Sequence, residues 1–198
     1  MSKWLNEVAL QGDLVRLELL DNKHEDGLRR AVQDGNLWEL WYTSSPHPDE
    51  AAAYIQTARH EYEADRSLPF AVIHKASDKV IGTTRYMNAV AQNKRLEIGT
   101  TWYAQSFQRT GINTECKFLL LQYAFETLDC IAVEFRTHWY NFRSRAAIAR
   151  LGAKQDGVLR NHSFDKTGNI RDTVVFSILR SEWKVVQQSL QFKMNKTY

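Results

Sequence analysis

Hydrophobic and polar residues follow two different periods along the chain, and their order predicts an α+β fold. Segments in which apolar residues alternate or are β-branched predict strands, whereas apolar residues three and four positions apart predict helices. Strands are expected at residues 14–20, 69–75, 80–87, 95–102, 131–137, 154–164 and 170–179. Helices are expected at residues 24–33, 48–65 and 141–151, from Gly111 onward, and from about residue 181.

The lengths of the connections predict how these strands pair. The three central strands are joined by short connections and should be antiparallel, whereas the strand–helix–strand unit at residues 95–137 should be parallel and right-handed. We therefore expect a mixed, mostly antiparallel seven-stranded sheet flanked by helices. A crevice for a ligand should open where the pairing changes from antiparallel to parallel. If residues 88–94 form a hairpin loop, Met87 faces Arg95 and Arg85 faces Glu97.

The segment that begins at Gly111 has an unusually apolar helical pattern. Apolar residues occupy two of its faces, at Ile112, Cys116, Leu119, Leu120 and Tyr123 and at Phe118, Leu121 and Phe125. Only a narrow polar stripe of Glu115, Gln122 and Glu126 remains for solvent. A helix with this pattern should be packed on most sides.

Composition and charge narrow the class of protein. The chain has 198 residues, which at ~100–200 residues per domain predicts a single domain spanning 1–198. It carries 26 Lys and Arg against 23 Asp and Glu, a net charge of +3. Residues 180–198, which include a basic tail from about residue 184, hold four bases and one acid and account for that excess. Because the rest of the chain is neutral, we expect no binding to nucleic acid.

The chain shows no sign of a membrane, disulfide or metal-binding role. No apolar run approaches the ~18 residues of a membrane span, and the N-terminus lacks a signal-peptide core, so we expect a soluble, cytoplasmic protein. Cys116 and Cys130 do not form a Cys-x-x-Cys pair, which favours reduced thiols packed in the core. The six histidines lack metal-binding spacing, so no metal site is expected.

A short loop between a predicted strand and the apolar helix could bind phosphate. Its residues are Gln108, Arg109, Thr110, Gly111, Ile112 and Asn113. The first turn of a helix has unpaired N–H groups and partial positive charge, the glycine lets the backbone approach a ligand, and Arg109 adds a cation. The alternative is an ordinary strand–helix turn with one glycine, because short motifs often match by accident.

Several segments, in this order and spacing, resemble the GCN5-related N-acetyltransferase (GNAT) family. The Gln-x-x-Gly loop at the head of a helix resembles the family's acetyl-coenzyme A loop. The stretches at residues 96–102, 111–117, 141–148, 150–153, 157–160 and 172–183 are similar to the branch that contains ribosomal-protein N-terminal acetyltransferases. This resemblance covers nearly the whole chain.

The resemblance implies where the cofactor, acetyl-coenzyme A, would bind. Strands ending at Trp102 and starting at Ile131 should splay apart, and the pantetheine arm should pair with the backbone of Thr101, Trp102 and Tyr103. Amides of residues 109–113 would hold the pyrophosphate. Asn141 and Ser144 are placed to bond the pantetheine arm, although both also suit a plain helix N-cap. Asn113 departs from the Gly or Ala that the family prefers and narrows the room for the phosphate.

The implied reaction is direct attack of a primary amine on the acetyl thioester in a ternary complex. Such an amine is largely protonated at neutral pH, so a base must accept a proton, and Glu97 resembles the family's base. Its alternative role is a cross-strand ion pair with Arg85. The family's acid, a tyrosine, is replaced by Ile148, which leaves Tyr103, Tyr140, water or an unprotonated thiolate as the options.

The acceptor is a small-molecule amine or a protein N-terminus. Trp38, Trp41 and Tyr42 lie in a segment that forms the acceptor wall in the family, although aromatic residues at this spacing also suit helix packing. We expect an acetyl-coenzyme A-dependent N-acetyltransferase that is a monomer or a homodimer. The missing tyrosine and Asn113 motivate an alternative, a non-catalytic coenzyme A-binding protein with a regulatory role.

Overall fold

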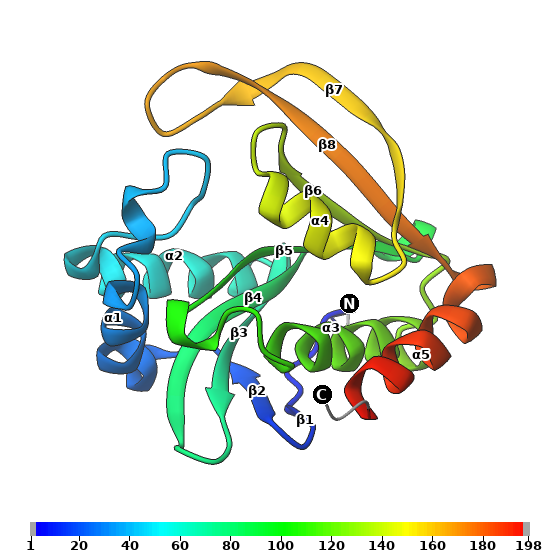
Figure 1. Ribbon diagram of the computed structural model, residues 1–198, viewed down its shortest axis with the longest axis horizontal. Coiled ribbons are helices and arrows are strands. Elements are labelled where there is room, and N and C mark those ends of the chain that lie inside the picture. The colour runs from blue at the N-terminus through cyan, green and yellow to red at the C-terminus, as the bar shows by residue number, and fades with distance from the viewer. Residues whose placement is uncertain (1–2, 196–198) are drawn as a thin grey trace.

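The computed structural model describes residues 3–195, and its centre is one mixed β-sheet (Figure 1). The order of strands across the sheet is β1-β2-β3-β4-β5-β6-β8-β7, and only β5 and β6 pair in parallel. The strands are β1 (Leu10–Gln11), β2 (Val15–Leu19), β3 (Ser67–His74), β4 (Lys79–Val90), β5 (Arg95–Tyr103), β6 (Ala132–His138), β7 (Lys154–Phe164) and β8 (Ile170–Leu179). The predicted α+β class and the parallel crossover between β5 and β6 are confirmed.

The sheet has eight strands rather than the seven expected from the sequence. The additional strand, β1, has only two residues, which pair with Leu17 and Arg16 of β2. Two residues are too few to produce an alternating pattern, so periodicity could not detect this strand.

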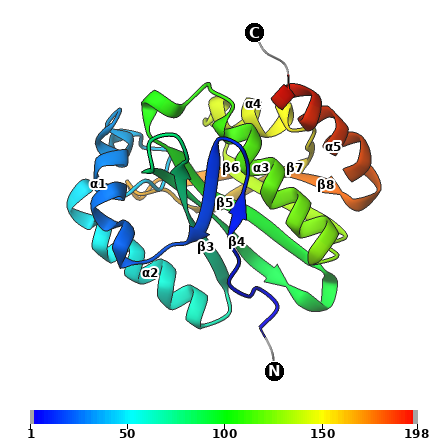
Figure 2. The same cartoon turned by 90° about the horizontal axis from the view of Figure 1, so that it is seen from below.

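Helices cover both faces of the sheet. They lie over its antiparallel N-terminal strands and over the parallel pair at its centre. Figure 2 shows α1 and α2 on one side of the sheet and α3 and α5 on the other. The helices are α1 (Glu25–Gln33), α2 (Ala51–Glu63), α3 (Ile112–Gln122), α4 (Phe142–Arg150) and α5 (Arg180–Asn195). Short 3₁₀ turns precede α1 and α2, and a π-helical turn at Tyr123–Thr127 continues α3.

The core is divided by the sheet into two clusters. The larger cluster packs α3, α4 and α5 against residues such as Phe70, Tyr86, Ile98 and Phe135. The smaller cluster packs α1 and α2 against Ala71, Trp102 and Ala104 on the opposite face. Because side chains of a strand alternate between faces, the odd-numbered residues Arg95, Glu97 and Gly99 of β5 belong to the α1–α2 face.

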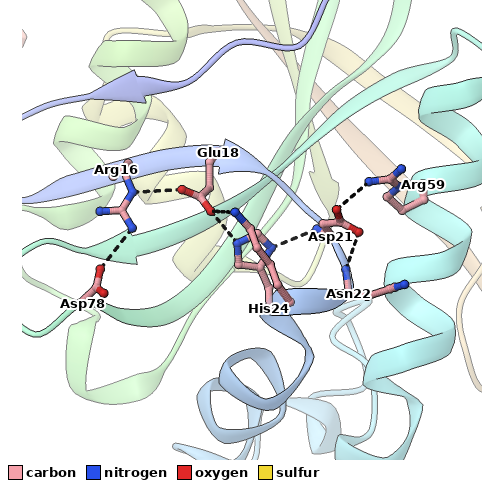
Figure 3. A network of polar contacts seen from close by, with 8 residues as sticks. Arg16, Glu18, Asp21, Asn22, His24, Arg59 and Asp78 are labelled. Carbon is pink, nitrogen blue, oxygen red and sulfur yellow. Dashed lines mark hydrogen bonds and ion pairs between the residues drawn. The ribbon is translucent and has the colours of Figure 1, made fainter.

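A polar network fixes the start of α1 to the sheet and to α2 (Figure 3). Glu18 on β2 accepts hydrogen bonds from Arg16 at 3.0 Å and His24 at 2.9 Å and pairs with Lys23 at 2.6 Å. Burial raises the pKa of Glu18, but the bonds from Lys23, His24 and Arg16 outweigh it and lower this pKa to about 2. These contacts hold the residues just before α1 in place.

The structure also bears on the two cysteines, on membrane-spanning helices and on the basic tail. Cys116 and Cys130 are free and buried. None of the helices in residues 3–195 is long and apolar enough to cross a membrane. Part of the basic tail, to Asn195, lies in α5, and its last residues, 196–198, lie outside the described residues.

We predict that Glu18→Gln lowers the melting temperature in a pH-dependent way. A depressed carboxyl pKa stabilises the fold above the unfolded pKa of about 4.5, and this contribution is lost as pH falls toward 2. Because the side chain is partly exposed, solvent screening limits the loss to about 1 kcal/mol, or ~2–4 °C. Thermal denaturation at pH 7 and pH 3 should show a larger difference from wild type at pH 7. An equal difference at both pH values would contradict this role.

Candidate active site

The parallel pairing of β5 with β6 stops after three residue pairs. Arg95 pairs with Ala132, Leu96 with Val133 and Glu97 with Glu134, after which no pair joins the two strands. Both strands continue, β5 to Tyr103 and β6 to His138. Backbone groups of the second half of β5 therefore face an opening on the side of β6, which is the splay expected from the sequence.

A bulge in β5 lies in the unpaired half of the strand. Thr83 pairs with Trp102 and Arg85 with Gly99, so Thr100 and Thr101 together oppose Thr84. Thr100 has a φ of 49°, in the left-handed region that non-glycine residues rarely adopt. Bulges of this kind re-aim backbone and side chains next to functional sites.

The loop after β5 leads directly to the uncapped start of α3. The Gln108 side chain donates to the Tyr103 carbonyl at 2.8 Å, and the Thr110 hydroxyl donates to the Phe107 carbonyl at 2.7 Å. Arg109 has a left-handed φ of 61°, and the exposed N-cap residue Gly111 supplies no capping side chain. The Ile112 N–H donates a long hydrogen bond to the Thr110 hydroxyl at 3.3 Å. The start of α3 thus presents N–H groups and the positive end of the helix dipole, which suits a phosphate.

Glu115 has a different role from the one expected. The sequence pattern placed this residue on a solvent-facing stripe, but its side chain is buried. Its carboxylate accepts hydrogen bonds from the backbone N–H groups of Asp13, Leu14 and Val15 at 2.8, 2.9 and 2.9 Å. A buried carboxylate needs such donors, and here they tie the first turn of α3 to the connection between β1 and β2.

Glu97 is not paired with Arg85, contrary to the expected cross-strand pair. The strand β4 extends to Val90 and contains an extra residue between Met87 and Val90, so Met87 faces Glu97 and Arg85 faces Gly99. Arg85 instead binds Glu61 of α2 at 2.9 Å. The expected loop at 88–94 is too long, because residues 88–90 belong to the bulged strand β4. Asn88, with a φ of 47°, lies in this bulged part.

The Glu97 carboxylate is buried and held on one side only. Its Oε2 accepts a hydrogen bond from the Asn88 amide at 2.8 Å and lies 3.5 Å from Nε of Arg136. Its Oε1 points to Gly99, 3.1 Å from the place that a Cβ on this glycine would occupy. Burial raises the pKa of Glu97, and the Asn88 bond and Arg136 oppose that rise without cancelling it.

Glu134, the register partner of Glu97, has the opposite electrostatic environment. It binds Arg95 at 2.5 Å and Arg136 at 3.0 Å. Burial raises its pKa, but the two arginines outweigh burial and lower it. Two adjacent glutamates with pKa values shifted in opposite directions are typical of acid–base sites, and Glu97, with the raised pKa, is the one better suited to accept a proton.

At the far side of the opening, α4 begins with Asn141. The Asn141 side chain caps the helix by accepting from the Ser144 N–H at 3.0 Å, so the capping role is confirmed, and Ser144 is half-buried in the first turn. Ile148 is buried in the larger core cluster. The side chain of Ile148 therefore contributes to packing of the core.

Aromatic side chains gather beyond the carboxyl end of β6. The Trp41 ring lies 4.9 Å from His138, 5.5 Å from Tyr42 and 5.9 Å from Tyr140 between ring centroids. Trp38 lies apart from this group, 5.5 Å from His47, and its carbonyl accepts from Lys166 at the tip of the β7–β8 hairpin. In Figure 1 this hairpin reaches past α4 toward the segment between α1 and α2.

The segment that carries these aromatic residues is mostly irregular. Only Leu37–Glu39 forms a 3₁₀ turn, so Trp38, Trp41 and Tyr42 do not form one helical face. Trp41 is 42% exposed and Tyr140 is 57% exposed, which leaves an aromatic surface open to a ligand. Sequence reasoning did not select His138 for this group; the only available signal was its place at the end of a parallel strand.

The residues described so far fit coenzyme A. An extended arm suits the unpaired backbone between β5 and β6, and a pyrophosphate suits the uncapped amides of α3. A side chain on Gly111 would meet one neighbour, Cδ1 of Leu14 at 3.0 Å, which would have to shift slightly.

Comparisons with known proteins agree with this geometry. The profile of the family described as Acetyltransferase (GNAT) domain matches residues 15–154. The chain is 34% identical to a GCN5-related N-acetyltransferase from Brucella melitensis, over 96% of this chain and 86% of that one, with a TM-score of 0.87. It is 27% identical to YdaF of Bacillus subtilis, provisionally named a ribosomal N-acetyltransferase, over 86% of this chain and 93% of that protein.

A more distant structure shows the fold alone. RimJ of Mycobacterium smegmatis, whose structure contains coenzyme A disulfide, is 20% identical with a TM-score of 0.77 over 94% of this chain and 93% of that one.

We predict that Asn88→Ala raises the pKa of Glu97 further. The Asn88 N–H favours the charged carboxylate, so its removal leaves burial less opposed. The measurement is a ¹³C NMR titration of the Glu97 carboxyl, with Asn6→Ala at the exposed N-terminal segment as the control. A Glu97 pKa that stays the same or falls in Asn88→Ala would contradict the assigned contact.

Proposed function

This chain belongs to the GNAT family of N-acetyltransferases, and we propose that it transfers an acetyl group from acetyl-coenzyme A to a primary amine by direct attack in a ternary complex. The observation that carries the proposal is the early end of the β5–β6 pairing beside the uncapped start of α3. The acceptor is a protein N-terminus or a small-molecule amine.

The cofactor is held mainly by backbone groups. Amides of Arg109, Thr110, Gly111, Ile112 and Asn113 bind the pyrophosphate, while the Gln108 side chain secures the loop to the end of β5. The unpaired backbone of Thr101, Trp102 and Tyr103 holds the pantetheine arm as an added strand would. On the opposite side of the arm, Asn141 and Ser144 supply further polar groups from the start of α4.

Bound acetyl-coenzyme A supplies an activated thioester, and the chain supplies a base and an oxyanion donor. Glu97 accepts a proton from the incoming ammonium or amine through Oε1, while Asn88 and Arg136 hold Oε2. Backbone N–H groups at the bulge, beside Gly99 or Thr101, stabilise the developing oxyanion.

The amine approaches from the face that carries Glu97. Trp41 and Tyr42 line this approach together with His138 and Tyr140, and Trp38 closes it against the β7–β8 hairpin. Aromatic faces attract a cation, so this wall favours a protonated amine before it loses its proton.

We expect acetyl-coenzyme A to stabilise the fold. At ~100 times its dissociation constant, a ligand adds about 2.7 kcal/mol to the free energy of unfolding, or roughly 5–10 °C in melting temperature. Gly111→Val should remove most of this shift without unfolding the protein, because its side chain enters the phosphate space. Gly157→Val is the matched control, since a side chain there meets nothing within 4 Å. A wild type that stays folded but unshifted at millimolar ligand overturns the proposal.

We expect Glu97→Gln to lower turnover by ~10²–10⁴-fold with little change in acetyl-coenzyme A affinity. The rising limb of the pH–rate profile should move, because the titrating base is gone. Glu7→Gln, at an exposed position of the N-terminal segment, is the control. Full turnover in Glu97→Gln would remove this residue from the mechanism.

A panel of amines and peptides separates the enzyme from its alternative. Transfer to any acceptor supports the enzyme, whereas tight binding of acetyl-coenzyme A without transfer or thioester hydrolysis favours a non-catalytic coenzyme A-binding protein.

A further inference from the structure

A buried lysine beneath the bulge has no role in the mechanism described so far. Lys117 projects from α3, and its residue is 5% exposed. Its Nζ donates to the Thr101 hydroxyl at 2.6 Å and to the Thr84 hydroxyl at 3.1 Å. Within residues 3–195 no carboxylate forms an ion pair with it, which is unusual because buried charges are normally paired.

The hydroxyl groups around Lys117 form a chain of hydrogen bonds. Thr84 and Thr101 are hydrogen-bonded at 2.7 Å, and Thr101 also donates to the Gly99 carbonyl at 3.3 Å. When Thr84 is the donor in the bond between the two threonines, the Thr101 oxygen accepts from Lys117 and Thr84. The Thr101 hydrogen is then directed to the Gly99 carbonyl. A distance of 3.3 Å is long for a hydroxyl donor, so this hydrogen is available for a better acceptor.

The chain of hydrogen bonds ends at the opening. Thr101 belongs to the bulge and to the half of β5 that β6 leaves unpaired, and it is half-buried while Lys117 is buried. In the proposed function the thioester lies against this segment. Thr101 therefore connects a buried ammonium group to the place where the sulfur of coenzyme A would lie.

The titratable neighbours of Lys117 remain neutral at physiological pH. They are Cys116 on α3 and Tyr103 on β5, which forms a hydrogen bond with Cys116, and burial raises the pKa of each. Burial lowers the pKa of Lys117 to about 7, with Cys116 as a small opposing influence. Lys117 can thus release a proton at the pH at which its neighbours cannot.

We propose that Lys117, through the Thr101 hydroxyl, protonates the thiolate that leaves when the amine displaces coenzyme A. This inference rests on the proposed function. As the carbon–sulfur bond breaks, its electron pair passes to sulfur, which takes the Thr101 hydroxyl proton while Thr101 takes one from Lys117. Thr101 is restored, Lys117 becomes a neutral amine, and solvent returns a proton to it. The proton of the attacking amine goes separately to Glu97.

Other groups are poorly placed to do this work. Ile148 is apolar and buried in the core, and the Tyr103 hydroxyl is buried with its pKa raised well above its ordinary value. Tyr140 is 57% exposed and packs against Trp41 on the acceptor side.

Lys117→Met tests the proposal because it removes the ammonium and keeps most of the length of the side chain. Transfer of acetyl at saturating substrates should fall by ~10²-fold or more, and the falling, alkaline limb of the pH–rate profile should disappear. Thr101→Val should give the same profile, and Thr101→Ser should recover the alkaline limb. Lys184→Met, at an exposed position on α5, is the matched lysine control.

Two further measurements do not depend on turnover. A ¹³C NMR titration of the lysine side chains should show one group with a lowered pKa in the wild type that is absent from Lys117→Met. The variant should also melt above the wild type, with a larger difference at pH 6.5 than at pH 10. The reason is that a depressed lysine pKa costs stability that returns only as pH rises toward the unfolded value.

The outcomes separate this inference from the proposed function. A wild type without transferase activity toward any acceptor overturns the proposed function. An active wild type whose Lys117→Met variant keeps the alkaline limb overturns the proton relay alone, even if the variant melts higher. Loss of the limb in Lys117→Met and Thr101→Val, but not in Lys184→Met or Thr101→Ser, supports it.

Discussion

The rest of the site depends on the early end of one pairing, that of β5 with β6. After Glu97 and Glu134 the two parallel strands separate, although each runs on for several residues. A sheet that closed along its full length would satisfy these backbone groups internally and leave no place for an extended ligand. The bulge at Thr100 and Thr101 lies in the open half of β5, so the same strand supplies both free backbone and a local change of direction.

This arrangement divides the chemistry between the two faces of the sheet. Glu97 lies on the face of α1 and α2, while Thr101 meets Lys117 on the face of α3. The proposed base and the proposed proton donor therefore approach the thioester from opposite sides and do not neutralise each other. Glu115 contributes by holding the first turn of α3 to the backbone around Leu14, which fixes both the amides proposed to bind phosphate and Lys117.

Most elements could be predicted from the sequence, because alternating and helical periods depend on local burial. The register of β4 with β5 could not, since the bulge near Asn88 moved the partner of Arg85 by two positions, from Glu97 to Gly99. The burial of Glu115 and Lys117 could not be predicted from the sequence either. A charged residue in a helix pattern predicts solvent, and only the fold shows that backbone amides or hydroxyl groups distant in sequence face these two side chains. The loop proposed to bind phosphate could be singled out from the sequence because its signal lies in consecutive residues.

The central claim is that coenzyme A completes the open edge of β5, and hydrogen–deuterium exchange of backbone amides tests it most directly. Addition of coenzyme A should slow exchange in two segments, residues 100–103 of β5 and residues 109–113 at the start of α3, because the ligand accepts their hydrogen bonds. Amides of α1 and of the outer strands β1 and β2 should change little. Unchanged exchange in both segments while coenzyme A is bound, or protection confined to another surface, would contradict the account.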